Sequence, residues 1–372
     1  PVYDFGWPDE YNGGGYSWGY NPRHFNVPEG SYATDAEHGE VRVNEFKQMV
    51  QTFHSNGINV VMDVVYNHLD SAGDFCYNKL VPYYFTRFWD KNGDWGSICS
   101  GSGVGNDFAT QRAMARNYIV DSLQYWVEEY HVDGFRFDLA GCIDTATINE
   151  AIRVIQAKYP SVLFYGEGWD NYGTNMEGYD TCTQYNSWMV PSFAFFNNTI
   201  RDAIGGNESQ DNTEWGFAMG SSNHRDTIMG SLRGINSWSS NPNQTVNYVS
   251  CHDGYTLTDK ICIKRDGAYW SEMAAMNRLA NAITLLSQGI PMIYSGDEML
   301  REKKAPAGWR AHNSGHVDGV NKDDLNSIKW SELVTKDYAQ VNDDYYSGLI
   351  AFRKNHSALR CSYIDSSGLP DA

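Results

Sequence analysis

The sequence has little positive charge and no long hydrophobic run. Its 372 residues include 28 lysines and arginines against 46 aspartates and glutamates, which gives a net charge of −18. Such an acidic chain repels nucleic acid and suits a neutral substrate, so we expect no nucleic-acid partner. No apolar run approaches the roughly 20 residues of a membrane helix, and no signal peptide is visible. We therefore expect no membrane span.

Paired cysteines are also missing. The seven cysteines contain no C-x-x-C pair, and an odd number cannot form a complete disulfide set. The sequence therefore predicts neither a zinc site nor a disulfide framework, and we expect no required cofactor. It leaves the compartment open, with a secreted or cell-surface location slightly favoured.

The composition is that of a globular protein, with 41% hydrophobic and 20% charged residues. The length fits one large barrel or two ordinary domains. Aromatic residues make up 14% of the chain, including 12 tryptophans and 25 tyrosines. Flat rings with polar tips serve both protein cores and surfaces that stack on sugars, so this excess favours neither alone.

Helical and strand patterns alternate from about residue 43 to 355. Apolar stripes predict helices over 43–55, 114–130, 148–158, 198–204, 271–287 and 345–355, and apolar runs predict strands over 58–65, 132–140, 162–166, 192–196, 244–250 and 290–294. Five of these strands end in polar or charged residues, which favours an α/β fold of the (β/α)8 barrel type. A closed barrel needs eight strands, so about two are expected before Pro1.

The run VDGFRFDLA at 132–140 places Arg136 and Asp138 on one strand face and Phe135 and Phe137 on the other. A guanidinium beside a buried carboxyl favours the ionised form and lowers the pKa, as a carboxylate nucleophile requires. A purely structural buried ion pair is the alternative.

Three acids stand at strand ends: Asp138, Glu167 and Asp253. Two carboxylates about 5–5.5 Å apart across a sugar make a retaining glycosidase. Arg136 should keep Asp138 ionised as the nucleophile. Glu167, beside glycines and aromatic residues, should have a raised pKa and act as the general acid. Asp253 is left to stabilise positive charge on the sugar.

Histidines and aromatic residues accompany these acids. His68 and His252 also stand at strand ends, where neutral imidazoles suit sugar hydroxyls, although each could be a loop or core residue. The loop GYSWGYNP at 15–22 presents Tyr16, Trp18 and Tyr20 at alternate positions. These rings predict either a stacking platform for a ring-shaped ligand or a plug at the edge of a core.

Four ordered motifs resemble those of the α-amylase superfamily, the family 13 glycoside hydrolases. They are DVVYNH at 63–68, GFRFDLA at 134–140, YGEGW at 165–169 and NYVSCHD at 247–253. The runs GYSWGYNPRHFNVPEGSY at 15–32 and YHVDGFRFDL at 130–139 resemble more narrowly the type I pullulanases, which cut α-1,6 branch links. This resemblance covers essentially the whole chain.

The resemblance implies a role for each candidate residue. Asp138 would be the nucleophile, Glu167 the acid/base and Asp253 the transition-state stabiliser. Sugar contacts in the reacting subsite would come from Arg136, His68 and His252, with Tyr20 stacking on the sugar and Trp18 and Trp169 lining neighbouring subsites. The partner would be an α-glucan, and we expect a monomer. Asn67 matches a calcium position of some α-amylases, but a hydrogen-bonded strand-end asparagine is the favoured interpretation.

The resemblance also implies a domain plan. Residues 1–358 would form a catalytic barrel lacking the first strand and most of the second, with loop insertions at 4–36 and 70–110, and 359–372 would begin a C-terminal β-domain. The fourth motif departs from the pullulanase pattern, because Gly254 follows His252-Asp253 where asparagine is usual. An isoamylase or glycogen-debranching type enzyme therefore stays open, as does a truncated α-glucan-binding domain without activity.

Overall fold

The computed structural model describes residues 1–6, 10, 16–89, 97–207, 214–239, 241–305, 308, 310–312 and 322–362. Its contacts divide the chain into two compact units, Pro1–Phe195 and Phe196–Ala372, here named the N-terminal and C-terminal units. None of the helices in these described ranges is long and apolar enough to cross a membrane. Gly15 and most of the proposed β-domain, 363–372, lie outside the described residues.

A parallel sheet organises the N-terminal unit. Strands β3 (Val61–Val64), β4 (Gly134–Phe137) and β5 (Leu163–Gly166) pair in chain order, and β5 then pairs with the start of β6 (Ala194–Phe196). The register aligns Asp63 with Arg136 and Arg136 with Tyr165. The predicted strands are therefore confirmed but shorter, because the apolar runs continue past the last ladder hydrogen bond.

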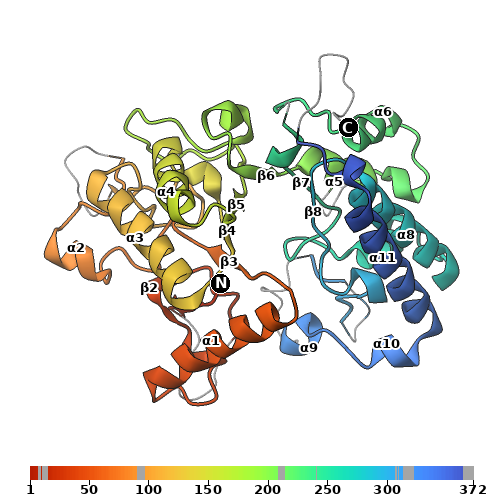
Figure 1. Cartoon of the computed structure of the whole chain (residues 1–372), viewed down its shortest axis with the longest axis horizontal. Coiled ribbons are helices and arrows are strands. Elements are labelled where there is room, and N and C mark those ends of the chain that lie inside the picture. The colour runs from red at the N-terminus through yellow and green to blue at the C-terminus, as the bar shows by residue number, and fades with distance from the viewer. Residues whose placement is uncertain are drawn as a thin grey trace. The chain divides into compact units, whose positions relative to one another are not determined.

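The N-terminal unit also contains the helices α1 (Gly39–Ser55), α3 (Ala113–Tyr130) and α4 (Thr145–Lys158) (Figure 1). The apolar stripe of α3 is buried as predicted: Ile119, Leu123, Trp126, Val127 and Tyr130. Helix α1 ends at Ser55, and its C-cap Asn56 is followed by Gly57 with φ +71°, as the Asn-Gly pair predicts. Helix α4 begins at the cap residue Asp144, which accepts a hydrogen bond from the Thr147 amide.

The two predicted loop insertions contain regular structure that the sequence pattern misses. The first holds an antiparallel pair, β1 (Tyr3–Phe5) and β2 (Pro22–Pro28), and the 3₁₀ turn η1 (Gly30–Tyr32). The second holds the short helix α2 (Cys76–Leu80). The sequence of β1 and β2 shows no alternation of apolar and polar residues, because the register of the pair is irregular. Phe25 of β2 is also buried among aromatic rings and stacks on Tyr66, with 5.2 Å between the ring centres.

The C-terminal unit contains the parallel strands β7 (Thr245–Asn247) and β8 (Ile290–Pro291) and a set of helices. The longer helices are α5 (Asn198–Gly205), α6 (Arg225–Leu232), α7 (Leu257–Lys264), α8 (Trp270–Leu286) and α11 (Asp337–Asn355). The short elements here and in the N-terminal unit are α9 (Lys322–Asn326), α10 (Glu332–Thr335), η3 (Ala140–Cys142), η4 (Gln184–Met189), η5 (Phe217–Met219), η6 (Pro242–Gln244), η7 (Asp297–Met299) and η8 (Ser357–Leu359).

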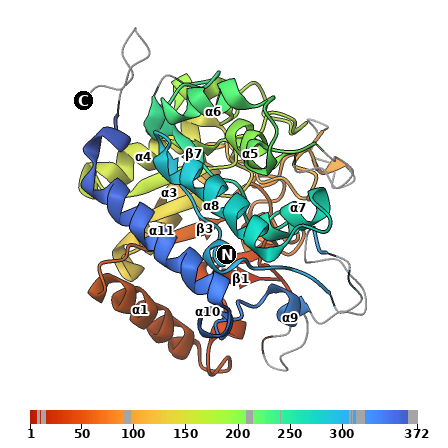
Figure 2. The same cartoon turned by 90° about the vertical axis from the view of Figure 1, so that its right-hand side faces the viewer.

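Helices α8 and α11 lie side by side in both views (Figures 1 and 2). The Tyr346 hydroxyl donates to Oδ1 of the buried Asn277 at 2.6 Å, and Arg353 donates to the carbonyl groups of Leu285 and Ser287 at the end of α8. Helix α11 begins at Asp337, well before the predicted start at Tyr345. The prediction missed its first turns because they lack the apolar stripe on which it relied.

Candidate active site

Four charged residues meet at the C-terminal ends of neighbouring strands in the N-terminal unit. Arg136 of β4 pairs through Nη1 with Asp63 of β3 at 2.8 Å and with Asp138 at 3.1 Å, and through Nη2 with Glu167 at 2.7 Å. Alternate side chains share one face of a strand, and parallel neighbours end at one edge, so this convergence follows from the register. We name Asp63, Arg136, Asp138 and Glu167 the Arg136 cluster.

Tyr20 joins the Arg136 cluster from the N-terminal loop. Its hydroxyl donates to Asp63 Oδ2 at 2.6 Å and accepts from Arg136 Nη1 at 3.5 Å. The guanidinium also lies 5.8 Å from the centre of the Tyr20 ring. The predicted stacking residue is thus fixed beside the acids rather than in a separate core.

Asn67 and His68 approach Asp138 from the segment after β3. Asn67 Nδ2 donates to Asp138 Oδ2 at 2.8 Å and to its carbonyl oxygen at 2.9 Å, and Asn67 Oδ1 contacts His68 Nδ1. Burial lowers the pKa of His68 to about 4, although a backbone hydrogen bond with Tyr20 opposes the shift. His68 is therefore a neutral imidazole at physiological pH, and the amide of Asn67 is engaged in hydrogen bonds.

The backbone after Asp138 turns toward Glu167. Leu139 has φ +41°, the left-handed region that a leucine adopts only at a cost, and its N–H donates to Glu167 Oε2 at 3.1 Å. Gly141 N donates to the Glu167 carbonyl at 3.0 Å. This strained turn orients the Glu167 carboxylate.

The titration of Asp138 differs from the prediction. Burial, followed by the nearby Glu167 carboxylate, raises the pKa of Asp138 to about 8, and the opposing effect of Arg136 does not overcome them. Arg136 does act to lower this pKa, but burial and the Glu167 carboxylate outweigh it, so the expectation that Arg136 keeps Asp138 ionised is wrong. For Asp63, burial also acts to raise the pKa, but Arg136, the N-terminal amino group and the Tyr20 hydroxyl together outweigh it and the pKa is lowered.

The predicted apolar setting of Glu167 is also wrong. Glu167 is only 8% exposed, yet its carboxylate contacts the Arg136 guanidinium and accepts a hydrogen bond from the Leu139 amide. Asp138 and Glu167 therefore form a coupled pair that retains a proton near neutral pH, and that proton belongs to the pair. A retaining glycosidase needs one protonated and one ionised carboxyl group.

Asp253 and His252 belong to the C-terminal unit, in the loop after β7. The Asp253 side chain is 52% exposed and lies 3.5 Å from His252 Nε2. Nζ of the buried Lys303 donates to the His252 carbonyl at 3.2 Å, and burial lowers the pKa of this lysine to about 8. The predicted convergence of Asp253 with Asp138 and Glu167 stays a prediction.

The two predicted tryptophans lie half-buried in the N-terminal unit. Trp18 Nε1 donates to the Tyr16 hydroxyl at 2.6 Å, and Trp169 lies three residues after the end of β5. Their role as subsite walls stays a prediction.

Asp63 is the site residue that the sequence interpretation left without a role. It bonds both Arg136 and Tyr20 and so links two strands to the N-terminal loop. A signal was present, because Asp63 interrupts the apolar run INVVMDVV and shares a strand face with Asn67.

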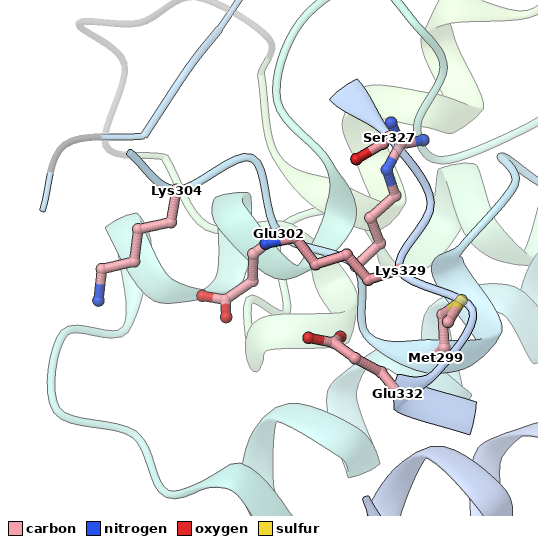
Figure 3. Close-up of a pocket in the computed structure, with 7 residues that line it drawn as sticks. Met299, Glu302, Lys304, Ser327, Lys329 and Glu332 are labelled. Carbon is pink, nitrogen blue, oxygen red and sulfur yellow. The ribbon is translucent and has the colours of Figure 1, made fainter. Parts of the chain in front are cut away.

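Two groups among the described residues bring potential metal ligands within 4.8 Å of one another: Cys251, His252 and Asp253, and Asp4, Glu10 and Glu29. A pocket of about 230 Å³ in the C-terminal unit is lined by Met299, Arg301, Glu302, Lys304, Ser327, Lys329 and Glu332. Figure 3 shows side chains of both charges bordering it. None of the predicted site residues lines this pocket.

Comparison with known proteins gives consistent likenesses. The family model "Alpha amylase, catalytic domain" matches residues 101–353. A pullulanase of Bacillus subtilis (strain 168) is 37% identical over 367 residues, which covers 97% of this chain and 49% of that protein. An isoamylase of Flavobacterium sp. is 30% identical over 394 residues, covering 92% of this chain and 48% of that protein.

Solved structures agree. The crystal structure of a Paenibacillus barengoltzii pullulanase in complex with maltohexaose and α-cyclodextrin matches with a TM-score of 0.88 and 36% identity, covering 98% of this chain and 55% of that one. These likenesses confirm the predicted (β/α)8-type fold. This chain spans about half the length of the curated relatives it matches.

Proposed function

Because this chain belongs to the α-amylase catalytic domain family, we propose that it is a retaining glycoside hydrolase that cleaves α-1,6 branch links in pullulan, starch dextrins or glycogen. The observation that carries the proposal is the pair Asp138 and Glu167 on one buried guanidinium. Two carboxyl groups sharing a proton beside a sugar-sized aromatic ring supply what a double displacement requires.

In the proposed reaction Asp138 attacks the anomeric carbon while Glu167 protonates the departing glycosidic oxygen. The reaction requires the shared proton to lie on Glu167 when the glucan is bound, because protonation of the leaving oxygen requires an acid there and attack requires an ionised Asp138. Water, deprotonated by Glu167, then releases the sugar from Asp138 and restores the pair. Asp253 stabilises positive charge on the ring.

The sugar in the reacting subsite is held by residues around the same acids. Arg136, His68 and His252 donate hydrogen bonds to hydroxyl groups, and neutral His68 can donate without adding charge beside the developing oxocarbenium ion. Tyr20 stacks on the sugar, and Trp18 and Trp169 line neighbouring subsites. The substrate is thus a neutral polysaccharide that the acidic chain does not repel.

An isoamylase-type debranching activity is the second candidate. Gly254 after His252-Asp253 favours it, because the type I pullulanases usually carry asparagine there. The two candidates differ on pullulan, where a pullulanase yields maltotriose and an isoamylase leaves the polymer largely intact.

Product analysis of the purified chain with pullulan and with glycogen tests the proposal. Maltotriose from pullulan is the expected product, and Asp138→Asn should lower turnover by at least about 10³-fold. Asp121→Asn on the exposed face of α3 is the control and should retain full activity. Glucan binding with no turnover by the unaltered chain, or unchanged turnover in Asp138→Asn, would refute the mechanism.

A further inference from the structure

The loop after β7 carries three adjacent residues, Cys251, His252 and Asp253, and the first of these has no role in the proposed sugar cleavage. Cys251, His252 and Asp253 offer a thiol, an imidazole and a carboxylate whose ligand atoms all lie within 4.8 Å of one another. We propose that these three side chains bind one divalent cation of the Zn²⁺ class. The binding itself is independent of the proposed function, and only its effect on turnover depends on it.

The geometry is close to that of a zinc site. Zn–S bonds of about 2.3 Å and Zn–N and Zn–O bonds of about 2.0–2.2 Å place tetrahedral ligand atoms roughly 3.3–3.7 Å apart. His252 Nε2 and Asp253 Oδ2 are already 3.5 Å apart. The Cys251 thiol points back along the same turn and donates to the Asp253 carbonyl at 3.4 Å. Small side-chain rotations therefore bring all three atoms onto one ion.

The triad is open to solvent. Cys251 and His252 are half-buried and Asp253 is exposed, so an ion reaches them without unfolding and water can complete its coordination. Among the other cysteines in the described ranges, Cys99, Cys142, Cys182 and Cys361 are buried, Cys262 is half-buried and Cys76 is exposed. Cys76 is in neither of the metal-capable groups, which makes it a matched control.

The thiol of Cys251 determines which class of divalent cation the site can bind. A thiolate with an imidazole selects Zn²⁺ or Co²⁺ over Mg²⁺ and Ca²⁺, which prefer oxygen ligands. On binding, the Cys251 thiol loses its proton to solvent and the sulfur–metal bond forms, with no change of oxidation state. The buried ammonium of Lys303, which bonds the His252 carbonyl, opposes a second positive charge and limits the affinity.

Occupation of the triad would inhibit glucan cleavage. A metal ion on the Asp253 carboxylate neutralises the charge that is proposed to stabilise the sugar cation, and it also engages His252. Inhibition by Zn²⁺ would then be reversed by a chelator, because no covalent bond of the protein is altered.

Cobalt titration of the whole chain tests the site directly. Co²⁺ should produce near-ultraviolet thiolate-to-metal absorption at one equivalent, and Zn²⁺ should displace it. Cys251→Ser should abolish this absorption and weaken Zn²⁺ binding at least about ten-fold by calorimetry, whereas Cys76→Ser should change neither. Absence of the band in the unaltered chain, or its persistence in Cys251→Ser, would overturn the proposal.

Turnover measurements separate this site from the proposed function. If the chain hydrolyses pullulan, Zn²⁺ should inhibit it at concentrations that saturate the cobalt-defined site, and Cys251→Ser should require at least about ten-fold more Zn²⁺. Stoichiometric binding to a chain without turnover supports the site and counts only against the proposed function. Inhibition that is equal in Cys251→Ser and the unaltered chain overturns the assignment of inhibition to this triad.

Discussion

The acids of the N-terminal unit and the acid of the C-terminal unit are set in opposite environments. The side chains of Asp138 and Glu167 are 12% and 10% exposed and share Arg136, whereas the Asp253 side chain is 52% exposed beside His252. In the first setting, burial and neighbouring charges change the pKa and fix the geometry. In the second, water screens the charge, so the carboxylate is free to meet a cation. Burial therefore determines that Asp138 has a raised pKa and that Asp253 is accessible to a cation from solvent.

Removal of the shared guanidinium should have the largest effect. Arg136→Met leaves Asp63, Asp138 and Glu167 buried without their cation, which should cost about 3–5 kcal/mol of unfolding free energy. Urea denaturation measures this loss. Arg153→Met, which breaks an exposed pair with Glu150, is the control and should leave the midpoint nearly unchanged. Equal midpoints for both variants would mean that the cluster does not depend on its cation.

The pH dependence of stability should expose the raised pKa of Asp138. Its folded pKa of about 8 lies above the ordinary 3.8, so between these values the folded state holds a proton that the unfolded state releases. Stability from this group is present in acid and is lost as pH rises toward 8, with a slope of roughly 1.4 kcal/mol per pH unit. Asp138→Asn should remove that slope in denaturation curves recorded from pH 5 to 8. An unchanged slope would contradict the shift.

A methyl group at Gly166 should cause a smaller loss. A Cβ at this position would lie 2.4 Å from the Phe137 carbonyl oxygen on the neighbouring strand, so β4 and β5 would have to separate. Gly166→Ala should therefore lower the unfolding free energy by about 1–3 kcal/mol. Gly173→Ala, where a Cβ meets nothing within 4 Å, is the matched control. The argument fails if both variants unfold together.

The smallest change in stability is expected at the exposed acid. Asp253→Asn should alter the unfolding free energy by no more than about 0.5 kcal/mol, because solvent already screens its carboxylate. The same variant should lose most of its glucan turnover if the proposed function holds. A large stability change would show that Asp253 has a structural role, and the contrast between the two environments would no longer hold.

Several features of the fold follow from local pattern. The stripe of Ile119, Leu123 and Trp126 predicts helix α3 and its buried face, and apolar runs locate the strands. Strand β2 escapes prediction because its Phe25 is buried by partners distant in sequence, including Tyr66 and Phe75. Strand ends are also missed, because the last ladder hydrogen bond depends on the neighbouring strand.

The sequence alone determined the residue types of the candidate site and their order. Strand alternation sets Arg136 and Asp138 on one face, and the polar residues that end successive apolar runs mark the edge where Glu167 meets them. These are local properties, because successive side chains along a strand point to opposite faces of the sheet.

Only the tertiary structure decided how those charges act. Whether Arg136 can keep Asp138 ionised depends on how deeply Asp138 is buried and on the carboxylate of Glu167 beside it, and both are fixed by packing between strands, not by neighbours along the chain. Electrostatic energy depends on distance and burial in three dimensions, so spacing in the sequence cannot supply it.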